Sequence, residues 1–215
     1  MYFVDNKCVL RKMYHNREEI ILASESPRRQ EYLKEMGIRF TVQPASVHEH
    51  HFDQESPEDF VLRMAREKAD VVSSEFPDSW VISGDTVVCL GNKILGKPAD
   101  EQEAIALLMM LSGREHCVKT GFCVAHCSRG VKIAQSVTTK VRFAEFPESV
   151  ARAYVAAGES LDKAGAYGIQ GKGIFLVKSI EGSYSNVVGL PLCELMEVLQ
   201  KNSVIELDVF IAGVG

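Results

Sequence analysis

Two arginines lie where a short apolar run gives way to a helix, a position that suits the binding of an anion. The run Ile20–Ala23 is typical of a buried strand and ends at the small polar residues Ser24–Ser26. Pro27 then fits the first position of a helix. Free backbone N–H groups and the positive end of the helix dipole meet at such a turn, so Arg28 and Arg29 create a site suited to phosphate.

The same two arginines can also be ordinary surface charge. On their own they could be solvated or paired with Glu25 and Glu31. The turn is not a Walker-type P-loop, because it has neither a glycine-rich run nor a Gly-Lys-Ser/Thr sequence. Anion binding therefore depends on whether other charged residues join this turn.

An acid stands inside Trp80–Leu90, the most apolar strand-like segment of the chain. Asp85 follows Gly84 and precedes Thr86, and a buried carboxylate is costly without a partner. Two interpretations remain open. Asp85 is a structural acid satisfied by turn amides beside Gly84, or it is a catalytic carboxylate at a break in the strand, where Gly84 admits a ligand and Thr86 supplies a hydroxyl.

Three lysines could extend the cationic turn into a cleft. Lys97 and Lys163 lie beside glycine or proline turns, and Lys68 lies off the centre of a helical apolar stripe. Singly, each could be an exposed lysine. Together with the arginines they could form a cationic cleft, and with Glu49 and Asp85 that cleft would hold a divalent metal and a polyphosphate.

The histidine-rich segment His48–His51 does not predict a zinc site. It is not an HExxH motif, because Phe52 stands where the second histidine would be. In an extended segment alternate side chains face opposite ways, so neighbouring members cannot share one site. Solvated loop histidines are the simpler interpretation, which disfavours a zinc hydrolase.

Composition and net charge indicate a globular protein that does not bind nucleic acid or anionic membranes in general. The 215 residues are 46% hydrophobic and 25% charged, enough for a substantial core in one domain. The formal charge of −5 argues against nucleic acid or an anionic membrane as a general partner, because both require a basic field. Any cationic site must therefore be local.

Localisation follows from segments that the sequence lacks. No apolar run approaches the roughly 20 residues that span a bilayer, and residues 1–19 form a polar extension without the hydrophobic core of a signal peptide. The six cysteines are dispersed, which favours free thiols over a disulfide framework. We therefore expect a cytoplasmic protein.

Periodicity predicts the elements that must position these residues in a mixed-sheet α/β protein. Helices are predicted from Pro27 to Met36, Ser56 to Val72, Asp100 to Leu111, Pro147 to Gly158 and Pro191 to Leu199. Strands are predicted at Ile20–Ala23, Ile38–Val42, Trp80–Leu90, Lys93–Leu95 and Ile174–Val177, and as a long hairpin of His116–His126 and Val131–Phe143. Asp162–Gly173, which is glycine-rich, and Glu181–Val188 are predicted loops.

Several motifs stand in a fixed order between Ile20 and Gln200. They are LASESPRRQEYL (22–33), ISGDTVV (82–88), GKP (96–98), GES and DKAGAYGIQGKG (158–173), and IEGSYSNVVGLPL (180–192). In this order they make the chain resemble the Maf-like family of nucleoside triphosphate pyrophosphatases. The resemblance covers 20–200, leaving an N-terminal extension at 1–19 and a C-terminal tail at 201–215.

The resemblance implies both a fold and a reaction. The fold is a two-lobed α/β structure around a long bent mixed β-sheet flanked by helices, similar to inosine triphosphate pyrophosphatases, with the site in a cleft. The reaction is hydrolysis of a nucleoside triphosphate between its α and β phosphates, which gives a nucleoside monophosphate and pyrophosphate. The cofactor is a divalent metal cation, usually Mg²⁺ or Mn²⁺.

The resemblance also assigns roles to individual residues. Asp85 stands at the position of the catalytic acid and, with Glu49, at the metal-binding position. Lys68 and Lys97 match metal- and phosphate-handling positions and are expected in the catalytic set, and Ser24, Arg28 and Arg29 match the phosphate-binding turn. Lys163 is a further candidate for binding the substrate, as one of the lysines of the cleft. The form KAGAYGIQG is similar to the branch acting on dTTP and UTP, whose matched specificity positions are Arg28, Thr86 and Gln170.

Two further expectations come with the family. The partner is the nucleotide substrate, with a homodimer as the expected assembly and with no nucleic acid or membrane. An alternative from another class is a nucleotide-binding regulator of cell division or septation with little turnover. The presence of all the expected catalytic residue types favours the enzyme.

Overall fold

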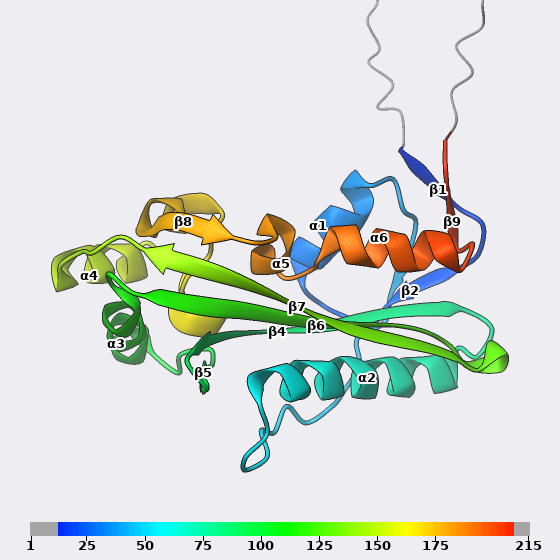
Figure 1. Cartoon of the computed structure of the whole chain (residues 1–215), viewed down its shortest axis with the longest axis horizontal. Helices are drawn as coiled ribbons and strands as arrows, with labels where there is room; N and C mark the ends of the chain where they lie inside the picture. Colours follow the sequence, from blue (N-terminus) through cyan, green and yellow to red (C-terminus); the bar gives the residue numbers. More distant parts are fainter. Residues whose placement is uncertain (1–12, 209–215) are drawn as a thin grey trace, which may run out of the picture.

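The computed structural model describes residues 13–208, which are built around one mixed β-sheet (Figure 1). The strand order is β3-β2-β4-β6-β7-β8, and β5 pairs with β4. The strands are β2 (Ile20–Leu22), β3 (Thr41–Val42), β4 (Trp80–Leu90), β5 (Lys93–Leu95), β6 (Glu115–His126), β7 (Val131–Phe143) and β8 (Val177–Glu181). β2 runs parallel to β3 and β4, and the remaining pairs are antiparallel.

Three long strands, β4, β6 and β7, run the length of the molecule and join its two lobes (Figure 1). The predicted hairpin is present: β6 and β7 pair from Glu115 opposite Arg142 to His126 opposite Val131. Its turn is a short 3₁₀ helix, η1 (Cys127–Arg129), closed by Gly130 at φ 64°, a left-handed conformation that favours glycine. The long strands therefore form the axis of the molecule.

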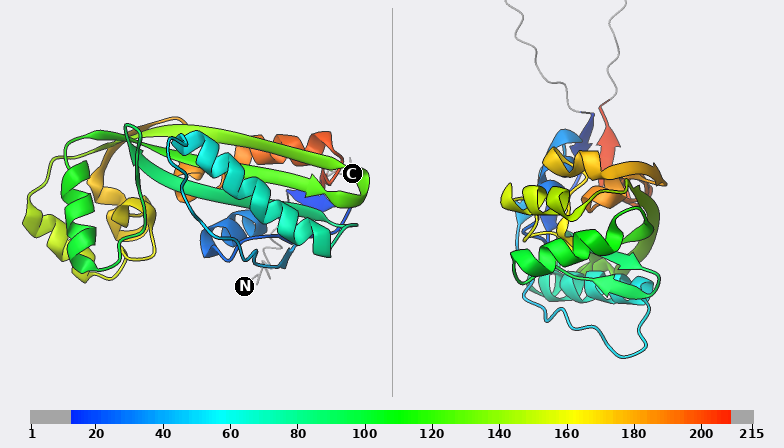
Figure 2. Two further views of the ribbon diagram at one scale, coloured as in Figure 1. Left: turned by 90° about the horizontal axis from the view of Figure 1, so that it is seen from below. Right: turned by 90° about the vertical axis from the view of Figure 1, so that its left-hand side faces the viewer.

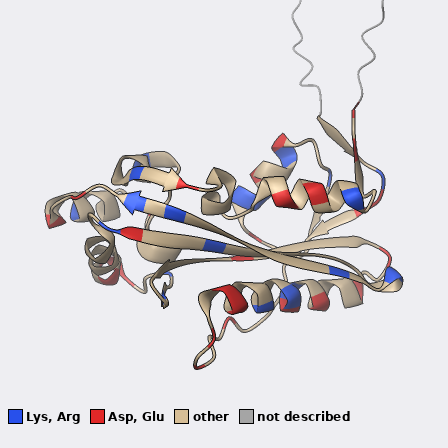
Figure 3. Ribbon diagram, in the orientation of Figure 1, with Lys and Arg blue, Asp and Glu red and all other residues tan. Residues whose placement is uncertain are grey.

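The first lobe has helices on both faces of the sheet. Its helices are α1 (Pro27–Glu35), α2 (Pro57–Glu75), α5 (Tyr184–Val188) and α6 (Leu192–Lys201). Figure 1 shows α2 below the sheet, with α1, α5 and α6 above it. The start of α2 is fixed by Ser56, whose hydroxyl accepts a hydrogen bond from Asp59 N. Figure 3 shows acidic and basic residues along α2. One of them, Lys68, is buried and pairs with Asp85 of β4.

The second lobe has a hydrophobic core of its own at the other end of the strands. It contains α3 (Glu101–Leu111), α4 (Glu148–Ala156) and the 3₁₀ helices η2 (Ala164–Ala166) and η3 (Gly171–Leu176). Its buried side chains include Leu108, Phe143 and Tyr167. Figure 2 shows this lobe set apart from α1 and α2. The predicted two-lobed α/β fold around a long bent mixed sheet is confirmed.

The two chain ends meet in a separate two-stranded ribbon. β1 (Tyr14–Asn16) pairs antiparallel with β9 (Ile205–Leu207), and Tyr14 and Ile205 are buried in the core of the first lobe. The predicted boundaries at residues 19 and 201 thus leave two short segments that pair with each other. The rest of the predicted extension and tail, residues 1–12 and 209–215, lies outside the described residues.

Four local predictions were wrong in their details. Ile174–Leu176 belongs to η3 rather than to a strand, and the strand β8 begins at Val177. The predicted loop Glu181–Val188 contains α5, because the Ser183 hydroxyl accepts a hydrogen bond from Asn186 N and caps a short helix. The strand predicted at residues 38–42 is reduced to Thr41–Val42. β4 continues unbroken through Gly84–Thr86, since β6 pairs with that stretch throughout.

Two further findings concern the described residues. No helix between residues 13 and 208 is long and apolar enough to cross a membrane. The five cysteines in this part of the chain are all free thiols, as the sequence predicts.

The backbone of α2 lies very close to the sheet at Gly121 of β6. A Cβ atom there would lie 2.3 Å from the Val61 carbonyl oxygen and 2.9 Å from Leu62 N, both backbone atoms of α2. Gly121 is also the β6 partner of Asp85. The missing side chain therefore lets α2 lie directly against the part of the sheet that carries Asp85.

Gly121→Ala should lower stability by about 1–3 kcal/mol, because helix backbone rather than a flexible side chain must move. For a chain of this size the melting temperature should fall by roughly 2–10 °C, measured by calorimetry or circular dichroism. Gly96→Ala is the matched control, since a Cβ atom at that position meets nothing within 4 Å. Equal melting temperatures for the two variants would contradict this packing constraint.

Candidate functional site

A large cavity opens where the β4 edge is left unpaired. β2 pairs with β4 as far as Ile82, and β5 pairs with it from Val88. Between these points, residues 83–87 pair only with β6. The cavity at this edge has a volume of about 1260 Å³. Because neighbouring side chains on a strand face opposite ways, an open edge lets Asp85 and Thr86 both line one cavity.

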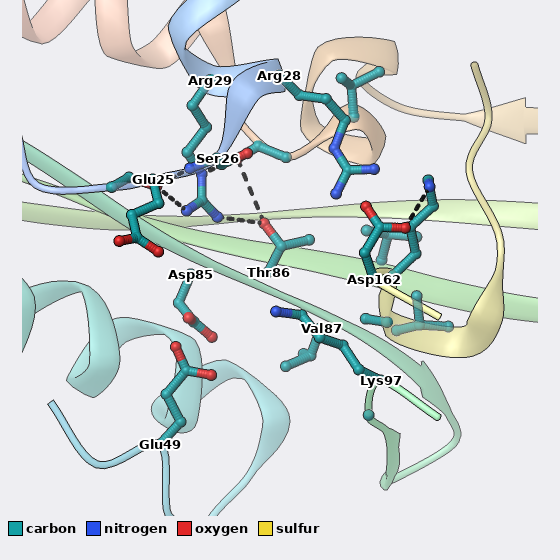
Figure 4. Close-up of a pocket in the computed structure, with 18 of the residues that line it drawn as sticks. Glu25, Ser26, Arg28, Arg29, Glu49, Asp85, Thr86, Val87, Lys97 and Asp162 are labelled. Atoms are coloured by element: carbon teal, nitrogen blue, oxygen red, sulfur yellow. Dashed lines mark hydrogen bonds and ion pairs between the residues drawn. The ribbon is translucent and has the colours of Figure 1, made fainter. Parts of the chain in front are cut away.

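All the site residues predicted from the sequence line this cavity. They are Ser24, Arg28, Arg29, Glu49, Lys68, Asp85, Thr86, Lys97, Lys163 and Gln170. They come from the β2–α1 turn, the first turn of α1, the loop before α2, α2 itself, β4, the turn after β5 and the glycine-rich loop. The two lobes therefore supply opposite walls of one site (Figure 4).

Lys68 joins two carboxylates on the α2 side of the cavity. Its Nζ lies 2.6 Å from Glu49 Oε1 and 2.6 Å from Asp85 Oδ1. The side chains of Lys68 and Asp85 are 11% and 10% exposed, while that of Glu49 is 55% exposed. Of the two interpretations left open by the sequence, turn amides do not satisfy Asp85; the Lys68 ammonium does. Figure 4 shows the Glu49 and Asp85 carboxylates turned toward each other.

The surroundings of Glu49 favour its ionised form. Burial by itself raises the pKa of the Glu49 carboxyl, but the hydrogen bond from Lys68 and the charges of Lys68, Lys97 and Arg29 outweigh it, so the pKa is lowered from its usual value. The carboxylate therefore carries its negative charge at neutral pH. The ionised carboxylate can therefore bind a cation without first losing a proton.

Arg29 is built into the opposite wall of the cavity. Its guanidinium is buried and donates to Gly189 O at 2.8 Å, Ser24 Oγ at 2.9 Å and Thr86 Oγ1 at 3.1 Å. Figure 4 shows its contact with Thr86. Burial lowers the pKa of the Arg29 guanidinium, while the charge of Asp85 acts in the opposite direction. Arg29 therefore ties the β2–α1 turn to the central strand and to the end of α5.

Arg28 is placed differently from its neighbour. It is half-buried, and its Nε atom is buried without a hydrogen-bond partner. Figure 4 shows its guanidinium extending toward Asp162 on the other side of the cavity. Ser26 directly precedes α1 but its side chain does not cap the helix; instead its backbone N donates to Ser24 Oγ. Of the two arginines, Arg28 is thus the one with donors left for a ligand.

The second lobe contributes the glycine-rich loop. Lys163 Nζ donates to Glu159 O at 2.6 Å and contacts Asp162 Oδ1 at 2.7 Å. Burial raises the pKa of the Asp162 carboxyl, but the hydrogen bond from Lys163 and nearby positive charges outweigh it, so the pKa is lowered. Gly165 adopts φ 65° and donates its N–H to Gly96 O. This bond joins the loop to the turn that carries Lys97.

Sequence reasoning missed two acidic residues of this wall. Glu159 and Asp162 line the cavity, and Glu159 Oε2 accepts a hydrogen bond from Lys172 N at 3.0 Å. The available signal was a pair of acids at the start of the glycine-rich loop, with Asp162 as its first residue and Glu159 three residues earlier. His51 also lines the cavity, although its ring Nε2 contacts Glu55 O rather than another cavity residue.

Comparison with known proteins adds family information to this geometry. The model of the family described as Maf-like protein matches residues 19–202. A dTTP/UTP pyrophosphatase of Desulfotalea psychrophila is 52% identical over 195 residues, covering 91% of this chain and all of that protein. A dTTP/UTP pyrophosphatase of Myxococcus xanthus is 49% identical and covers 85% of this chain and 91% of that protein.

Solved structures with low sequence identity share the fold. The Ham1 protein of Staphylococcus aureus aligns with a TM-score of 0.51 and 12% identity, covering 86% of this chain and all of that one. A HAM1 protein from Coxiella burnetii aligns with a TM-score of 0.50 and 16% identity, covering 86% of this chain and 99% of that one. At such identities the likeness concerns the fold alone.

Arg29 is bonded within the protein and Arg28 is not, so replacing them should lower the free energy of unfolding by different amounts. Arg29→Met should lower stability by about 2–4 kcal/mol, because it deletes charge-assisted hydrogen bonds and leaves buried acceptors such as Gly189 O unpaired. Arg28→Met should change stability by less than about 0.5 kcal/mol. Urea unfolding of both variants checks this, and equal losses would contradict the structural role given to Arg29.

Proposed function

Because the chain belongs to the Maf-like protein family, we propose that it hydrolyses dTTP and UTP to the nucleoside monophosphate and pyrophosphate. The observation that carries this proposal is the pair of facing carboxylates in a cavity also lined by lysines and arginines. A nucleoside triphosphate is a polyanion, so cationic side chains can bind its phosphates while the carboxylates handle the cation and the water. The relatives named dTTP/UTP pyrophosphatase support the choice of base.

The residues present fit a divalent metal such as Mg²⁺ or Mn²⁺. Glu49 and Asp85 both reach one ammonium nitrogen at 2.6 Å, so their oxygens can face one small cation. Mg²⁺ is usually bound by one or two carboxylates with phosphate oxygens of the substrate completing its shell. We propose that these two residues hold the metal, which when bound would polarise the phosphate and neutralise its charge.

Asp85 is the residue we assign to proton transfer. It lies at the edge of β4 with 10% of its side chain exposed, and Lys68 orients its carboxylate. In this position Asp85 would accept a proton from the water that attacks the α phosphorus. Attack on that atom releases pyrophosphate and leaves the nucleoside monophosphate.

The cationic residues would stabilise the leaving group. Negative charge grows on the bridging oxygen as the α–β bond breaks, and fixed positive charges lower the energy of that state. Lys97 is exposed in the cavity and Arg28 has free donors, so both can turn to the phosphates without breaking a hydrogen bond. Lys163 is held by Asp162 on the same side.

Release of pyrophosphate from a panel of nucleoside triphosphates tests the function. With Mg²⁺ present, dTTP and UTP should be hydrolysed with kcat/KM at least tenfold above ATP, GTP and CTP. Preference for a purine would overturn the substrate assignment. Binding of dTTP without measurable turnover would favour the nucleotide-binding regulator instead.

Asp85→Asn should lower kcat for dTTP by roughly 10³-fold, because an amide has the shape of the carboxylate but cannot accept the proton. The Kd for dTTP should stay within about fivefold, measured by calorimetry. Asp70→Asn is the control, since Asp70 pairs with Lys132 outside the cavity, and its activity should be normal. More than about a tenth of normal activity in Asp85→Asn would refute the role of Asp85.

Lys68→Met should bind Mn²⁺ about tenfold more tightly than the native protein in the absence of nucleotide, because the ammonium between the two carboxylates competes with the metal. Paramagnetic resonance of free Mn²⁺ gives the Kd. Lys119→Met, which removes a lysine paired with Glu58 outside the cavity, should leave it unchanged. Unchanged or weaker Mn²⁺ binding in Lys68→Met would place the metal elsewhere.

We also propose a homodimer, the assembly expected from the family. Sedimentation equilibrium should then give twice the mass of one chain. The mass of a single chain at micromolar concentration would overturn this assembly and leave the proposed reaction unaffected.

A further inference from the structure

A row of hydroxyl groups continues from the cavity into the sheet. Thr86 lines the cavity, and its direct partner across the β4–β6 pair is Thr120, which is completely buried. The two Oγ1 atoms lie 2.9 Å apart, and Thr120 Oγ1 is 3.1 Å from the carbonyl oxygen of Asn186 in α5. Thr120 therefore connects a cavity hydroxyl to a fixed backbone acceptor.

The direction of this row follows from counting hydrogens. A hydroxyl has one hydrogen and two lone pairs. The Thr120 hydrogen goes to Asn186 O, because a carbonyl can only accept. The bond between the two threonines must then be donated by Thr86. Arg29, which can only donate, supplies a hydrogen to Thr86 Oγ1. The row thus runs Arg29 to Thr86 to Thr120 to Asn186 O.

The opposite direction is less favourable. Thr86 could instead donate to Gly189 O, but that distance is 3.4 Å, and Thr120 would then have to give up its bond to Asn186 O. The acceptor end is also rigid. Asn186 is completely buried, and its Nδ2 donates to Val118 O and Thr139 Oγ1. In either arrangement the Thr86 hydrogen points into the protein.

With Arg29 using one lone pair and Thr120 taking the hydrogen bond, Thr86 Oγ1 has one lone pair and no hydrogen left for a ligand in the cavity. It repels phosphate oxygens and base carbonyls, which are also acceptors, and it attracts a donor. In uracil and thymine the ring atom N3 carries a hydrogen, whereas N3 of cytosine is an acceptor without one. An acceptor facing N3 therefore separates these bases by hydrogen-bond polarity, which discriminates more strongly than shape alone.

We propose that Thr120 is a positioning residue that holds Thr86 as an acceptor for N3–H of uracil or thymine and so excludes cytosine nucleotides. This inference rests on the proposed function, because it concerns the base read by the same site. Thr120 does not contact the substrate. It acts only by accepting the hydrogen bond that Thr86 donates. Without it, the acceptor left inside the protein for Thr86 is Gly189 O at 3.4 Å. Because that contact is long, Thr86 can turn its hydrogen to the cavity and accommodate either base.

The test compares kcat/KM for UTP and CTP, and for dTTP and dCTP, in variants of Thr120. Thr120→Val has the same shape without the hydroxyl, and Thr120→Ala is a second hydroxyl-free variant in case valine disturbs folding. Either should lower the UTP/CTP ratio at least about tenfold. Thr120→Ser restores the hydroxyl and should restore the native ratio. Thr138→Val, an exposed threonine on β7, is the control and should leave the ratio unchanged.

The possible outcomes are distinguishable. A purely structural role would lower kcat/KM for both bases equally, and an unchanged ratio in a folded variant overturns the inference. If Thr86 contacts a sugar hydroxyl rather than the base, the UTP/CTP ratio should also stay unchanged in the Thr120 variants, because UTP and CTP have the same sugar. A native protein that hydrolyses UTP and CTP equally would also overturn it. If neither UTP nor dTTP is hydrolysed, it is the proposed function that fails.

Discussion

The buried ammonium of Lys68 is the constraint on which the site depends. An ammonium with 11% of its side chain exposed requires negative partners, and Glu49 and Asp85 supply them at 2.6 Å. To bring Lys68 to Asp85, α2 must lie directly on the sheet, and the lack of a side chain at Gly121 makes that approach possible. The packing of α2 on the sheet, the pairing of Gly121 with Asp85 and the charge of Lys68 therefore depend on one another.

The other side of β4 has a second polar assembly centred on Arg29. Its guanidinium donates to Ser24, Thr86 and Gly189, so it links the β2–α1 turn, the central strand and the end of α5. The hydroxyl row through Thr120 extends this assembly under the cavity floor. One strand therefore separates the carboxylates of Glu49 and Asp85, proposed above to hold the metal, from the hydroxyl of Thr86, proposed above to contact the base.

The two lobes divide the remaining tasks. The first lobe carries the charged assemblies on a closely packed helix and sheet, whereas the second contributes the cations Lys97 and Lys163 from turns. Each lobe has its own core, and only the long strands run through both (Figure 1). A site between separate cores can accept a triphosphate without opening either of them.

Much of this could be read from local signals. Ser56 and Asp100 mark helix starts, Gly130 closes the hairpin, and the ordered motifs place the chain in its family, because such features depend on residues close in sequence. All the site residues predicted from the sequence do line one cavity. Local propensity was insufficient at Ile174–Leu176, where apolar residues favoured a strand but the chain forms η3 with Ile174 exposed.

Tertiary structure alone decided which charges meet and how they are engaged. Nothing local shows that Arg29 is bonded within the protein while Arg28 is not, or that Lys68 turns inward, because the partners lie on other elements. Asp85 and Thr86 point to opposite faces of β4 and reach one cavity only because β2 ends and β5 begins on either side of them. An open strand edge depends on which neighbours are absent, and that is a property of the assembled sheet rather than of the strand sequence.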